Sequence, residues 1–458
     1  MSTAAKFSLP SSFDTDPYYS ELKERIILST GMTYYNERDS ELYSKLKQRM
    51  EILHLKTCKE YLFYLEKDIR GSTELDSLIC ELTIGETYFF RGPDQFETLK
   101  NEIIPELIRK NSGRKQLRIW SAGCSTGAEP YSLAILLEEY FRNQLMGWDV
   151  TILGSDINRQ FLARATEGLY DSWAFRTSEF DFRNKYFRQA GKNWKISKEI
   201  ASKVQFQYHN LLKHPYPSLI NNLEALDLIL CRNVMIYFDQ ATFMKIIRHF
   251  EESLTQEGWL ILSHAEQRLT LGSFESIQKN NSFFYRKKST RIPKVTQPPF
   301  IHQASQIELP RSTPPQSNEL DISFIRNSAD RGEFSSAVVY CERFLATHQM
   351  SSTGHFYFGL VLEHVGRSQE AIEHLLRSYE LDPESTLSCY YLGLIFQSRK
   401  NIAEAVKWYE KARSILTHIQ EDVLFSDADG INARELGLLI SANLDILSLS
   451  ASSENGKE

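Results

Sequence analysis

Apolar residues in the first eighty positions recur at intervals of three and four, as they do on one side of an amphipathic helix. The pattern is carried by Leu42, Leu46, Met50, Leu53, Leu62 and Leu65. Gly71 and Ser72 interrupt it. We therefore predict an all-α N-terminal domain over residues 1–80.

From Leu117 onward the pattern changes to short apolar runs that alternate with amphipathic helical stretches. The runs span residues 117–122, 150–155, 204–208, 226–231 and 259–263. This alternation predicts an α/β domain over residues 81–287, with a mostly parallel sheet covered by helices on both faces. Ligands of such a sheet bind at the carboxyl ends of its strands.

A proline-rich stretch follows the predicted α/β domain. Its prolines, which fall among Gln, Ser and Thr, are Pro293, Pro298, Pro299, Pro310, Pro314 and Pro315. Such a segment buries too little apolar surface to offset its ordering entropy, and proline keeps it extended. We predict a linker over residues 288–318.

Small residues recur with a period of 34 after this stretch. The columns are Gly332 and Gly366, then Gly359 and Gly393, then Ala337, Ala371 and Ala405. This is the period of tetratricopeptide repeats (TPR), in which small residues let paired helices approach closely. We predict an all-α TPR solenoid over residues 319–420 and a capping helix over residues 430–450.

The net charge of the 458-residue chain is −6, which argues against a nucleic-acid binder because the basic footprint that displaces phosphate counterions is missing. From Glu319 to the end, 12 Lys and Arg residues face 21 Asp and Glu residues, a balance of −9 that leaves +3 for the rest. The acidity therefore belongs to the predicted repeats.

The six cysteines form no CxxC pair and do not cluster with histidines, so neither a disulfide framework nor a metal site is predicted. Residues 1–20 lack the basic start and apolar stretch of a secretory signal. No window approaches the roughly 20 apolar residues that span a bilayer. We expect a cytoplasmic protein that is not inserted into a membrane.

Two predicted strand ends carry the residues best suited to ligand binding. The first strand runs into Gly123 and Gly127, which permit a tight turn and close backbone approach to a ligand. Asp156 follows the second strand, where a carboxylate can accept both hydroxyls of a ribose. The turn lacks the dinucleotide fingerprint and the lysine of a phosphate-binding loop. A nucleoside ligand without a polyphosphate fits best, and S-adenosylmethionine (SAM) is the commonest one.

Several short motifs, in order, resemble those of the CheR-type chemotaxis receptor methyltransferases. They are residues 86–91 (Glu-Thr-Tyr-Phe-Phe-Arg), 123–132, 155–157 (Ser-Asp-Ile), 210–211 (Asn-Leu), 231–238 (Cys-Arg-Asn-Val-Met-Ile-Tyr-Phe) and 264–266 (His-Ala-Glu). The resemblance covers residues 21–286, about 60% of the chain. It implies a Rossmann-like SAM-dependent fold that methylates glutamate side chains of methyl-accepting chemoreceptors.

The resemblance also implies a role for each matching residue. The implied cofactor contacts are Thr87, Arg91, Gly123, Glu129, Asp156, Asn210, Leu211, Arg232 and Asn233. Among them, Glu129 matches a residue near the amino group of the methionine part, and Asp156 matches the ribose ligand. Arg91 matches a position close to the methionine end of the cofactor, and Tyr237 matches a tyrosine near the transferred methyl group. We take Arg91 and Tyr237 as the catalytic residues.

The implied reaction needs positioning more than it needs a base. A glutamate side chain, with a reference pKa of about 4.3, is already ionised at neutral pH. The barrier lies in removing water from it and in holding oxygen, carbon and sulfur in line. The Arg91 guanidinium and the Tyr237 hydroxyl can fix a carboxylate without accepting a proton. Gly85, often Asn in the family, and Ala128, often Glu, predict weaker or altered cofactor contacts.

Receptor recognition is expected in two regions. By resemblance, a basic docking surface lies on the N-terminal domain, mostly along one helical side, although a merely solvated face is the alternative. Its residues are Lys45, Arg49, Lys56 and Lys59. Residues 168–204 resemble a small antiparallel β insertion that some members use to grip a receptor tail, a role left open here. The repeats would recruit an unidentified protein partner and could bring the enzyme to membrane receptor arrays.

Two other functions stay open on the sequence alone. One is a catalytically silent adaptor, in which the methyltransferase fold only docks and the repeats assemble a signalling complex. The other is a methyltransferase of small molecules, which the repeats and the basic N-terminal region disfavour. Cys124 and Cys231 have no paired His or Asp in the sequence motifs that would argue for nucleophilic catalysis, so we expect them to be small buried residues. His264 could act as an acid or a base, but a structural role is the favoured interpretation.

Overall fold

The protein is described by a computed structural model that covers residues 13–68, 70–176, 180–266, 271–280, 282–289, 321–399 and 401–420, with scattered positions between 423 and 447. The chain divides into two compact units. The first comprises Met1–Tyr216 and Ala225–Lys287, and the second comprises Pro217–Glu224 and Lys288–Glu458. Most of the predicted linker, residues 290–318, lies outside the described residues.

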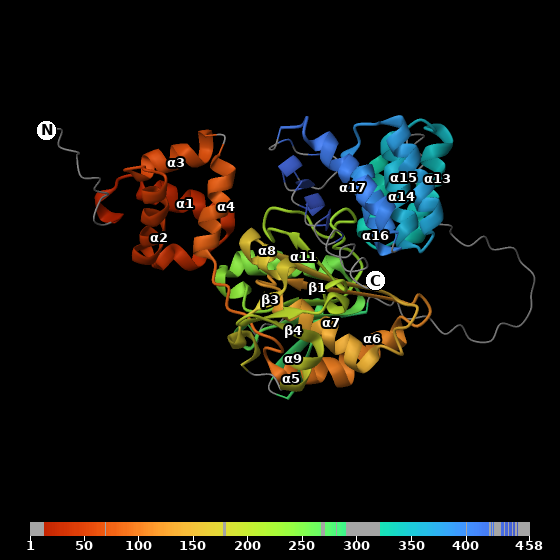
Figure 1. The fold of residues 1–458 in the computed structure, drawn as a ribbon, viewed down its shortest axis with the longest axis horizontal. Helices are drawn as coiled ribbons and strands as arrows, with labels where there is room; N and C mark the ends of the chain where they lie inside the picture. The colour runs from red at the N-terminus through yellow and green to blue at the C-terminus, as the bar shows by residue number, and fades with distance from the viewer. Residues whose placement is uncertain are drawn as a thin grey trace, which may run out of the picture. The chain divides into compact units, whose positions relative to one another are not determined.

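The N-terminal part of the first unit contains the α-helices α1 to α4 (Figure 1). They are α1 (Tyr19–Thr30), α2 (Asp39–Ile52), α3 (Cys58–Lys67) and α4 (Gly71–Leu82). Their apolar stripes meet in one cluster that includes Leu42, Leu46 and Met50. Gly71, at the interruption of the helical pattern, begins α4, and a Cβ there would overlap the Leu65 carbonyl oxygen near the end of α3.

A seven-stranded sheet forms the centre of the first unit. Its strands are β1 (Gln116–Ala122), β2 (Asp149–Asp156), β6 (Val204–Tyr208), β7 (Leu226–Cys231), β8 (Leu254–Leu262), β9 (Phe274–Lys279) and β10 (Ser282–Lys287). The spatial order is β6-β2-β1-β7-β8-β10-β9. The first five strands are parallel, and β10 and β9 pair antiparallel at one edge. The prediction of a mostly parallel sheet is confirmed.

Helices cover both faces of this sheet. They include α5 (Pro93–Thr98), α6 (Ile104–Lys110), α7 (Ala128–Phe141), α8 (Arg159–Glu167) and α11 (Gln240–Ser253). Ile119 of β1 belongs to the apolar cluster that contains the α7 side chains. The next residue, Trp120, packs its ring on Phe250 of α11, with 5.3 Å between the ring centroids. Because successive side chains of a strand point to opposite faces, α7 and α11 lie on opposite sides.

A small antiparallel sheet occupies the region of the expected insertion. It contains β3 (Leu169–Tyr170), β5 (Asn193–Ile196) and β4 (Phe187–Ala190), in that spatial order, with α9 (Phe180–Tyr186) and α10 (Lys198–Ala201). The Phe89 ring stacks on Phe175 at 5.1 Å and meets Phe187 edge-on at 5.0 Å. Phe89 therefore anchors the segment that carries Thr87 and Arg91 to this insertion.

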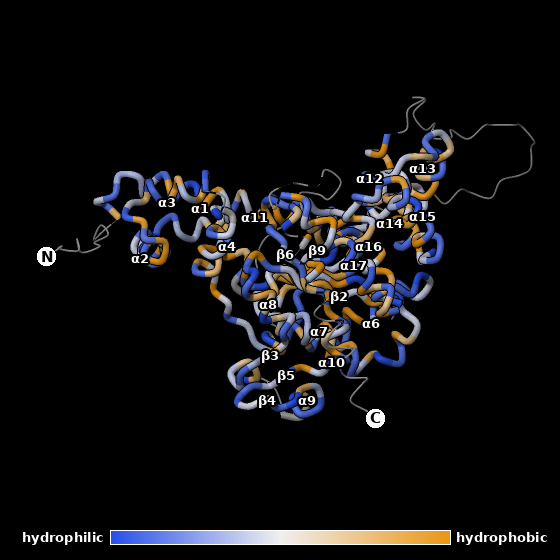
Figure 2. The backbone as a smooth tube through the Cα atoms, turned by 45° about the horizontal axis from the view of Figure 1, so that its top comes forward, coloured by the Kyte–Doolittle hydropathy of each residue, from blue (hydrophilic) through white to orange (hydrophobic). Residues whose placement is uncertain are grey.

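The second unit contains three successive helix pairs. They are α12 (Ile322–Asp330) with α13 (Phe334–Thr347), α14 (Ser352–His364) with α15 (Ser368–Leu381), and α16 (Thr386–Ser398) with α17 (Ile402–Leu416). Figure 2 shows the hydrophobic stretches of α14 and α16. The described residues between 433 and 447 are helical. Leu436, Leu444 and Leu447 among them belong to the apolar cluster formed by the side chains of the helix pairs.

The glycines and alanines that recur every 34 residues lie where the two helices of a pair meet. The three alanines of the second helices, Ala337, Ala371 and Ala405, are fully buried. A Cβ added at Gly359 would lie 2.6 Å from Leu375, and one added at Gly393 would lie 2.6 Å from Tyr409. Each glycine thus lets the first helix of its pair approach the second. The predicted all-α repeat region is confirmed.

Candidate functional site

One pocket lies at the carboxyl ends of β1, β2 and β7. It encloses about 1060 Å³ when its opening to solvent is included. From β1 the chain crosses to β2 on one side and later returns to β7 on the other, which is the switch point where α/β sheets bind ligands. All the predicted cofactor and catalytic residues line it: Thr87, Arg91, Gly123, Glu129, Asp156, Asn210, Leu211, Arg232, Asn233 and Tyr237.

The glycine turn after β1 forms the floor of the pocket. Gly123 has a φ of 75°, and a Cβ at this position would overlap a methyl group of Val234. The N–H groups of Gly123 and Cys124 both donate to the Ser155 carbonyl, at 2.8 and 2.9 Å. Glycine is therefore needed both for the left-handed backbone and for the close approach of the loop after β7.

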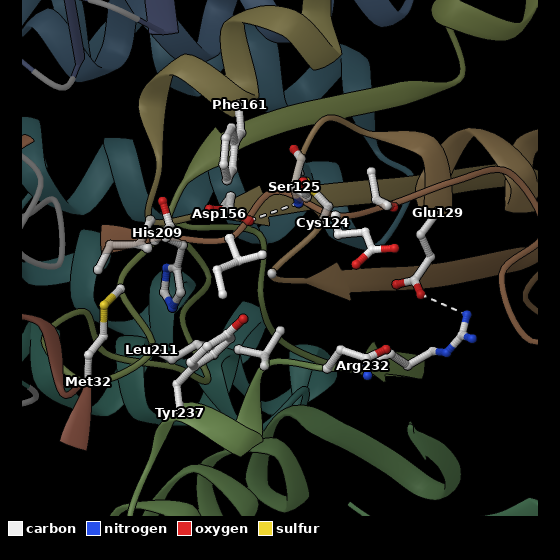
Figure 3. A pocket seen from close by; sticks show the side chains of 18 of the residues that line it. Met32, Cys124, Ser125, Glu129, Asp156, Phe161, His209, Leu211, Arg232 and Tyr237 are labelled. Atoms are coloured by element: carbon white, nitrogen blue, oxygen red, sulfur yellow. Dashed lines mark hydrogen bonds and ion pairs between the residues drawn. The ribbon is translucent and has the colours of Figure 1, made fainter. Parts of the chain in front are cut away.

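Asp156 ends β2 with its carboxylate in the pocket (Figure 3). Its two oxygens accept hydrogen bonds from the N–H groups of Ser125 and Asn158, both at 2.8 Å. Burial raises the pKa of Asp156 to about 6, although these N–H groups oppose the rise. The carboxylate is therefore mainly ionised at neutral pH. Each oxygen retains an acceptor site, which suits two neighbouring hydroxyl groups.

Glu129 and Arg232 form an ion pair at the other end of the pocket (Figure 3). Glu129 lies in the first turn of α7, where the helix dipole favours a negative charge. Its carboxylate accepts from the Ser121 hydroxyl at 2.7 Å and from Arg232 Nη1 at 3.0 Å. Arg232 also donates through Nη2 to the Arg91 carbonyl. Arg232 thus fixes two pocket segments and holds the charge of Glu129 in place.

Tyr237 lies on a 3-10 helix, Met235–Tyr237, with its ring half-buried. The ring meets Tyr34 edge-on at 5.7 Å, and the Thr33 hydroxyl donates to the Tyr237 carbonyl at 3.2 Å. Burial raises the pKa of Tyr237, whereas the charge of Arg91 lowers it. The hydroxyl therefore stays protonated at neutral pH and can donate a hydrogen bond. Arg91 Nη1 is held by the Glu86 carbonyl at 2.8 Å.

Glu266 is a buried residue of the site region whose role sequence reasoning missed. Its carboxylate accepts from the N–H groups of Asn233 at 3.0 Å, Met235 at 2.7 Å and Ser263 at 2.9 Å. It also accepts from the Ser263 hydroxyl at 2.6 Å. Asn233 itself has a φ of 60°. Glu266 therefore holds the loop after β7 in an unusual backbone conformation. The signals for it in the sequence were its position just after β8 and its place in the His-Ala-Glu motif.

The N-terminal helices also contribute to the pocket, which the sequence did not indicate. Thr30 and Met32 line it, and the Asn210 side-chain amide donates to the Ser29 carbonyl at 3.4 Å. His209 lines the pocket as well, and burial lowers its pKa well below the usual value. His209 is therefore neutral at pH 7.

Gly85 is explained by a second residue that sequence reasoning did not single out. A Cβ at Gly85 would lie 2.5 Å from the ring of Phe161, and that ring lines the pocket beside Asp156 (Figure 3). A larger residue at position 85 would displace the ring. Glycine at position 85 therefore makes room for an aromatic wall of the pocket.

The four basic residues of the expected docking surface do not share one helical side. Lys45 and Arg49 lie on α2, Lys59 lies on α3, and Lys56 lies in the segment between these helices. The expectation that most of them lie on one helical side is wrong, because α2 ends at Ile52 and only Lys45 and Arg49 share a helix. Arg49 is held in a mostly buried ion pair with Glu74 at 2.6 Å, whereas Lys56 and Lys59 are exposed.

Cys124 lines the pocket, but Cys124, Cys231 and His264 do not have the surroundings of a nucleophile or of a catalytic acid–base pair. Burial raises the thiol pKa of both cysteines well above the usual value, so they stay protonated. His264 Nε2 lies 2.9 Å from an Asp94 oxygen and 2.8 Å from the Ser282 hydroxyl. Both contacts use the same ring nitrogen, so this cluster does not have the relay geometry of a catalytic triad.

Within the described ranges, no group of His, Cys, Asp and Glu side chains could hold a metal ion. Among the helices that the structure describes, none is both long and apolar enough to cross a membrane.

The pocket at the switch point, with a carboxylate suited to ribose hydroxyls beside a turn that lacks the lysine of a phosphate-binding loop, fits a SAM-dependent methyltransferase. Residues 85–291 match the family model of the CheR methyltransferase SAM-binding domain. A chemotaxis protein methyltransferase of Borreliella burgdorferi is 34% identical over 264 residues, which are 57% of this chain and 91% of that protein. This chain belongs to the CheR family, whose cofactor is SAM.

A longer relative also matches the region after residue 287. The probable biofilm formation methyltransferase WspC of Pseudomonas aeruginosa is 28% identical over 422 residues, 85% of this chain and 96% of that protein. The TPR domain of Sgt2 from Aspergillus fumigatus covers 32% of this chain and 87% of its own, with 19% identity and a TM-score of 0.25. That score is too low to support an argument, so the repeats are assigned from their period and their helix pairs.

Proposed function

We propose that this protein transfers a methyl group from SAM to glutamate side chains of a methyl-accepting chemoreceptor, and that the products are glutamate methyl esters. The observation that supports it most is the placement of Arg91 and Tyr237 in one pocket with Asp156 and Glu129. Membership of the CheR family supports the same reaction.

The residues of the pocket fit SAM. Asp156 would hold the ribose hydroxyls, and the Glu129 carboxylate would attract the amino group of the methionine part. Met32, Leu211 and Phe238 supply apolar walls for the uncharged parts of the cofactor. When bound, SAM supplies an electrophilic methyl carbon.

The chain's own residues would bind and orient the glutamate of the receptor. The Tyr237 hydroxyl, kept protonated by burial, would donate to a carboxylate oxygen, and the Arg91 guanidinium would pair with its charge. Neither group takes up a proton, in keeping with a nucleophile that is already ionised. Closure of the pocket by the helix-end residues Thr30 and Met32 would exclude water from this carboxylate.

The proposal is tested with the full-length protein, methyl-labelled SAM and membranes that contain chemoreceptors. Base-labile label on a receptor-sized band is expected, and Tyr237→Phe and Arg91→Ala should each lower its rate by about tenfold or more, since one lost orienting bond is worth roughly 1.4 kcal/mol. Tyr140→Phe, which changes an exposed tyrosine of α7, is the control. Parental rates in both pocket variants would contradict the assigned roles.

The same experiment separates the other two functions. SAM binding measured by calorimetry without any receptor label would indicate a small-molecule methyltransferase. Absence of SAM binding would indicate a silent adaptor.

We further propose that the protein acts in the cytoplasm and that its acidic repeats recruit a signalling partner, which raises the concentration of the enzyme near receptor arrays. A chain that ends at Pro315 should then lose more methylation in cells than with concentrated purified receptor. Equal loss in both settings would contradict recruitment. Lys56→Glu with Lys59→Glu should raise the KM for receptor if these exposed lysines dock it.

A further inference from the structure

The second unit contains a segment that is far from the repeats in sequence. Residues 217–224 lie between β6 and β7 along the chain, yet they group with the repeat helices. Leu219 and Ile220 are only 1% and 6% exposed, and both belong to the apolar cluster formed by the repeats. An aliphatic pair from outside the repeats is thus buried among the repeat side chains.

Polar contacts hold this segment at three points, one on each helix pair. The Leu219 N–H donates to Asp330 Oδ1, at the end of α12, at 2.8 Å. The hydroxyl of Tyr391, on α16, donates to the Ile220 carbonyl. A carboxylate oxygen of Glu224, a fully buried residue, lies 2.7 Å from His364 Nε2 at the end of α14. Two of the three contacts therefore bind main-chain groups of the segment, and the third binds its acidic side chain.

These three contacts come from the first helix of each pair, and those helices form one continuous face. Helix α14 lies against both α12 and α16. In repeat solenoids, such a face is the one that binds extended ligands. The segment therefore occupies the surface on which a protein partner would be expected.

The bound segment is ordered by its own hydrogen bonds. The Leu223 N–H donates to the Ser218 carbonyl at 2.9 Å, and the Asn222 N–H donates to the Leu219 carbonyl at 3.2 Å. The Asn221 N–H donates to the Ser218 hydroxyl at 3.0 Å. A segment folded into a compact turn loses less conformational entropy on binding than an extended peptide does.

We propose that the face formed by α12, α14 and α16 is a peptide-binding site whose ligand is residues 217–224 of the same chain. A protein partner that binds this face would have to displace the internal ligand. We expect such a partner to carry the same chemistry, which is two adjacent aliphatic residues and a glutamate four positions after the second of them. Because the segment is covalently attached, its effective concentration is on the order of millimolar. The proposal is independent of methyl transfer.

The test uses the full-length protein and a fluorescent peptide that contains residues 215–226. In the variant Leu219→Ser with Ile220→Ser, the internal ligand is weakened, and the peptide should bind at least tenfold more tightly than to the parental protein. Leu28→Ser with Ile52→Ser is the matched control, because these residues are of the same types and are 69% and 61% exposed. Equal peptide affinity for the parental and Leu219→Ser, Ile220→Ser proteins would overturn the proposal.

Hydrogen exchange gives a second measurement that does not depend on the double variant folding. Tyr391→Phe removes only the hydroxyl that holds the Ile220 carbonyl. The amides of Leu219 and Leu223 should then exchange at least tenfold faster, while amides of β1 keep their rates. Unchanged exchange in residues 217–224 would overturn the proposal.

Discussion

Replacing Glu266 by glutamine tests whether one buried carboxylate holds the loop that forms a wall of the SAM pocket. Glu266 Oε2 accepts from the N–H groups of Asn233 and Ser263 and from the Ser263 hydroxyl, while Oε1 accepts from the Met235 N–H. An amide of the same shape keeps one oxygen, so its NH₂ group must face one of these donors.

The cost can be estimated from these contacts. With the amide oxygen in place of Oε2, three hydrogen bonds remain but lose the charge, at about 1 kcal/mol each. The Met235 N–H then faces another donor, which costs about 1–3 kcal/mol. Easier burial of the neutral amide offsets part of the sum. We expect Glu266→Gln to lower the free energy of unfolding by about 2–4 kcal/mol.

Urea unfolding followed by tryptophan fluorescence measures this change, because five of the six tryptophans lie in the first unit. Calorimetry should also show weaker SAM binding, by about tenfold, since the loop carries Arg232 and Asn233. Glu275→Gln, at an exposed position on β9, is the control. A loss below about 0.5 kcal/mol, with unchanged SAM affinity, would refute the reasoning, because that is the range of ordinary surface substitutions.

Three further predictions concern the pocket and the repeats. Burial raises the pKa of Asp156 to about 6, so calorimetry should show SAM affinity falling as the pH drops below that value, and a pH-independent affinity between 5 and 7.5 would contradict it. Gly123→Ala should lower the free energy of unfolding by more than about 1–2 kcal/mol, because the new Cβ combines a positive φ with an overlap with Val234. Gly147→Ala is the control: Gly147 also has a positive φ, of 78°, but a Cβ there would meet no atom within 4 Å, so the cost should be only about 1 kcal/mol. Urea unfolding compares the two. Gly393→Ala should lower the melting temperature of the repeats, seen by circular dichroism, since its Cβ would lie 2.6 Å from a tyrosine ring of α17; an unchanged melting temperature would show that this contact is loose.

Much of the fold was predictable because its signals are local. Apolar residues spaced three and four positions apart indicated the N-terminal helices. Each of the five predicted apolar runs overlaps one strand of the sheet, namely β1, β2, β6, β7 or β8. The period of 34 marked the helix pairs, since Gly359 and Gly393 let the two helices of a pair approach closely, and Gly332 and Gly366 have the positive φ of the turn between them. Basic residues on the N-terminal helices were less predictable, because a turn between α2 and α3 changes which side they occupy.

The sequence by itself determined the order of the elements, the class of ligand and the pocket residues at the turns and strand ends, because these segments carry their chemistry in adjacent residues. Tertiary structure alone decided which of these side chains pair. Glu129 meets Arg232 across 103 positions of sequence, and Glu266 supports a loop more than thirty residues before it. Tertiary structure likewise decided that residues 217–224 group with the repeats, which are far from them in sequence. Local periodicity records which face of an element is apolar, but only the packed chain determines what that face meets.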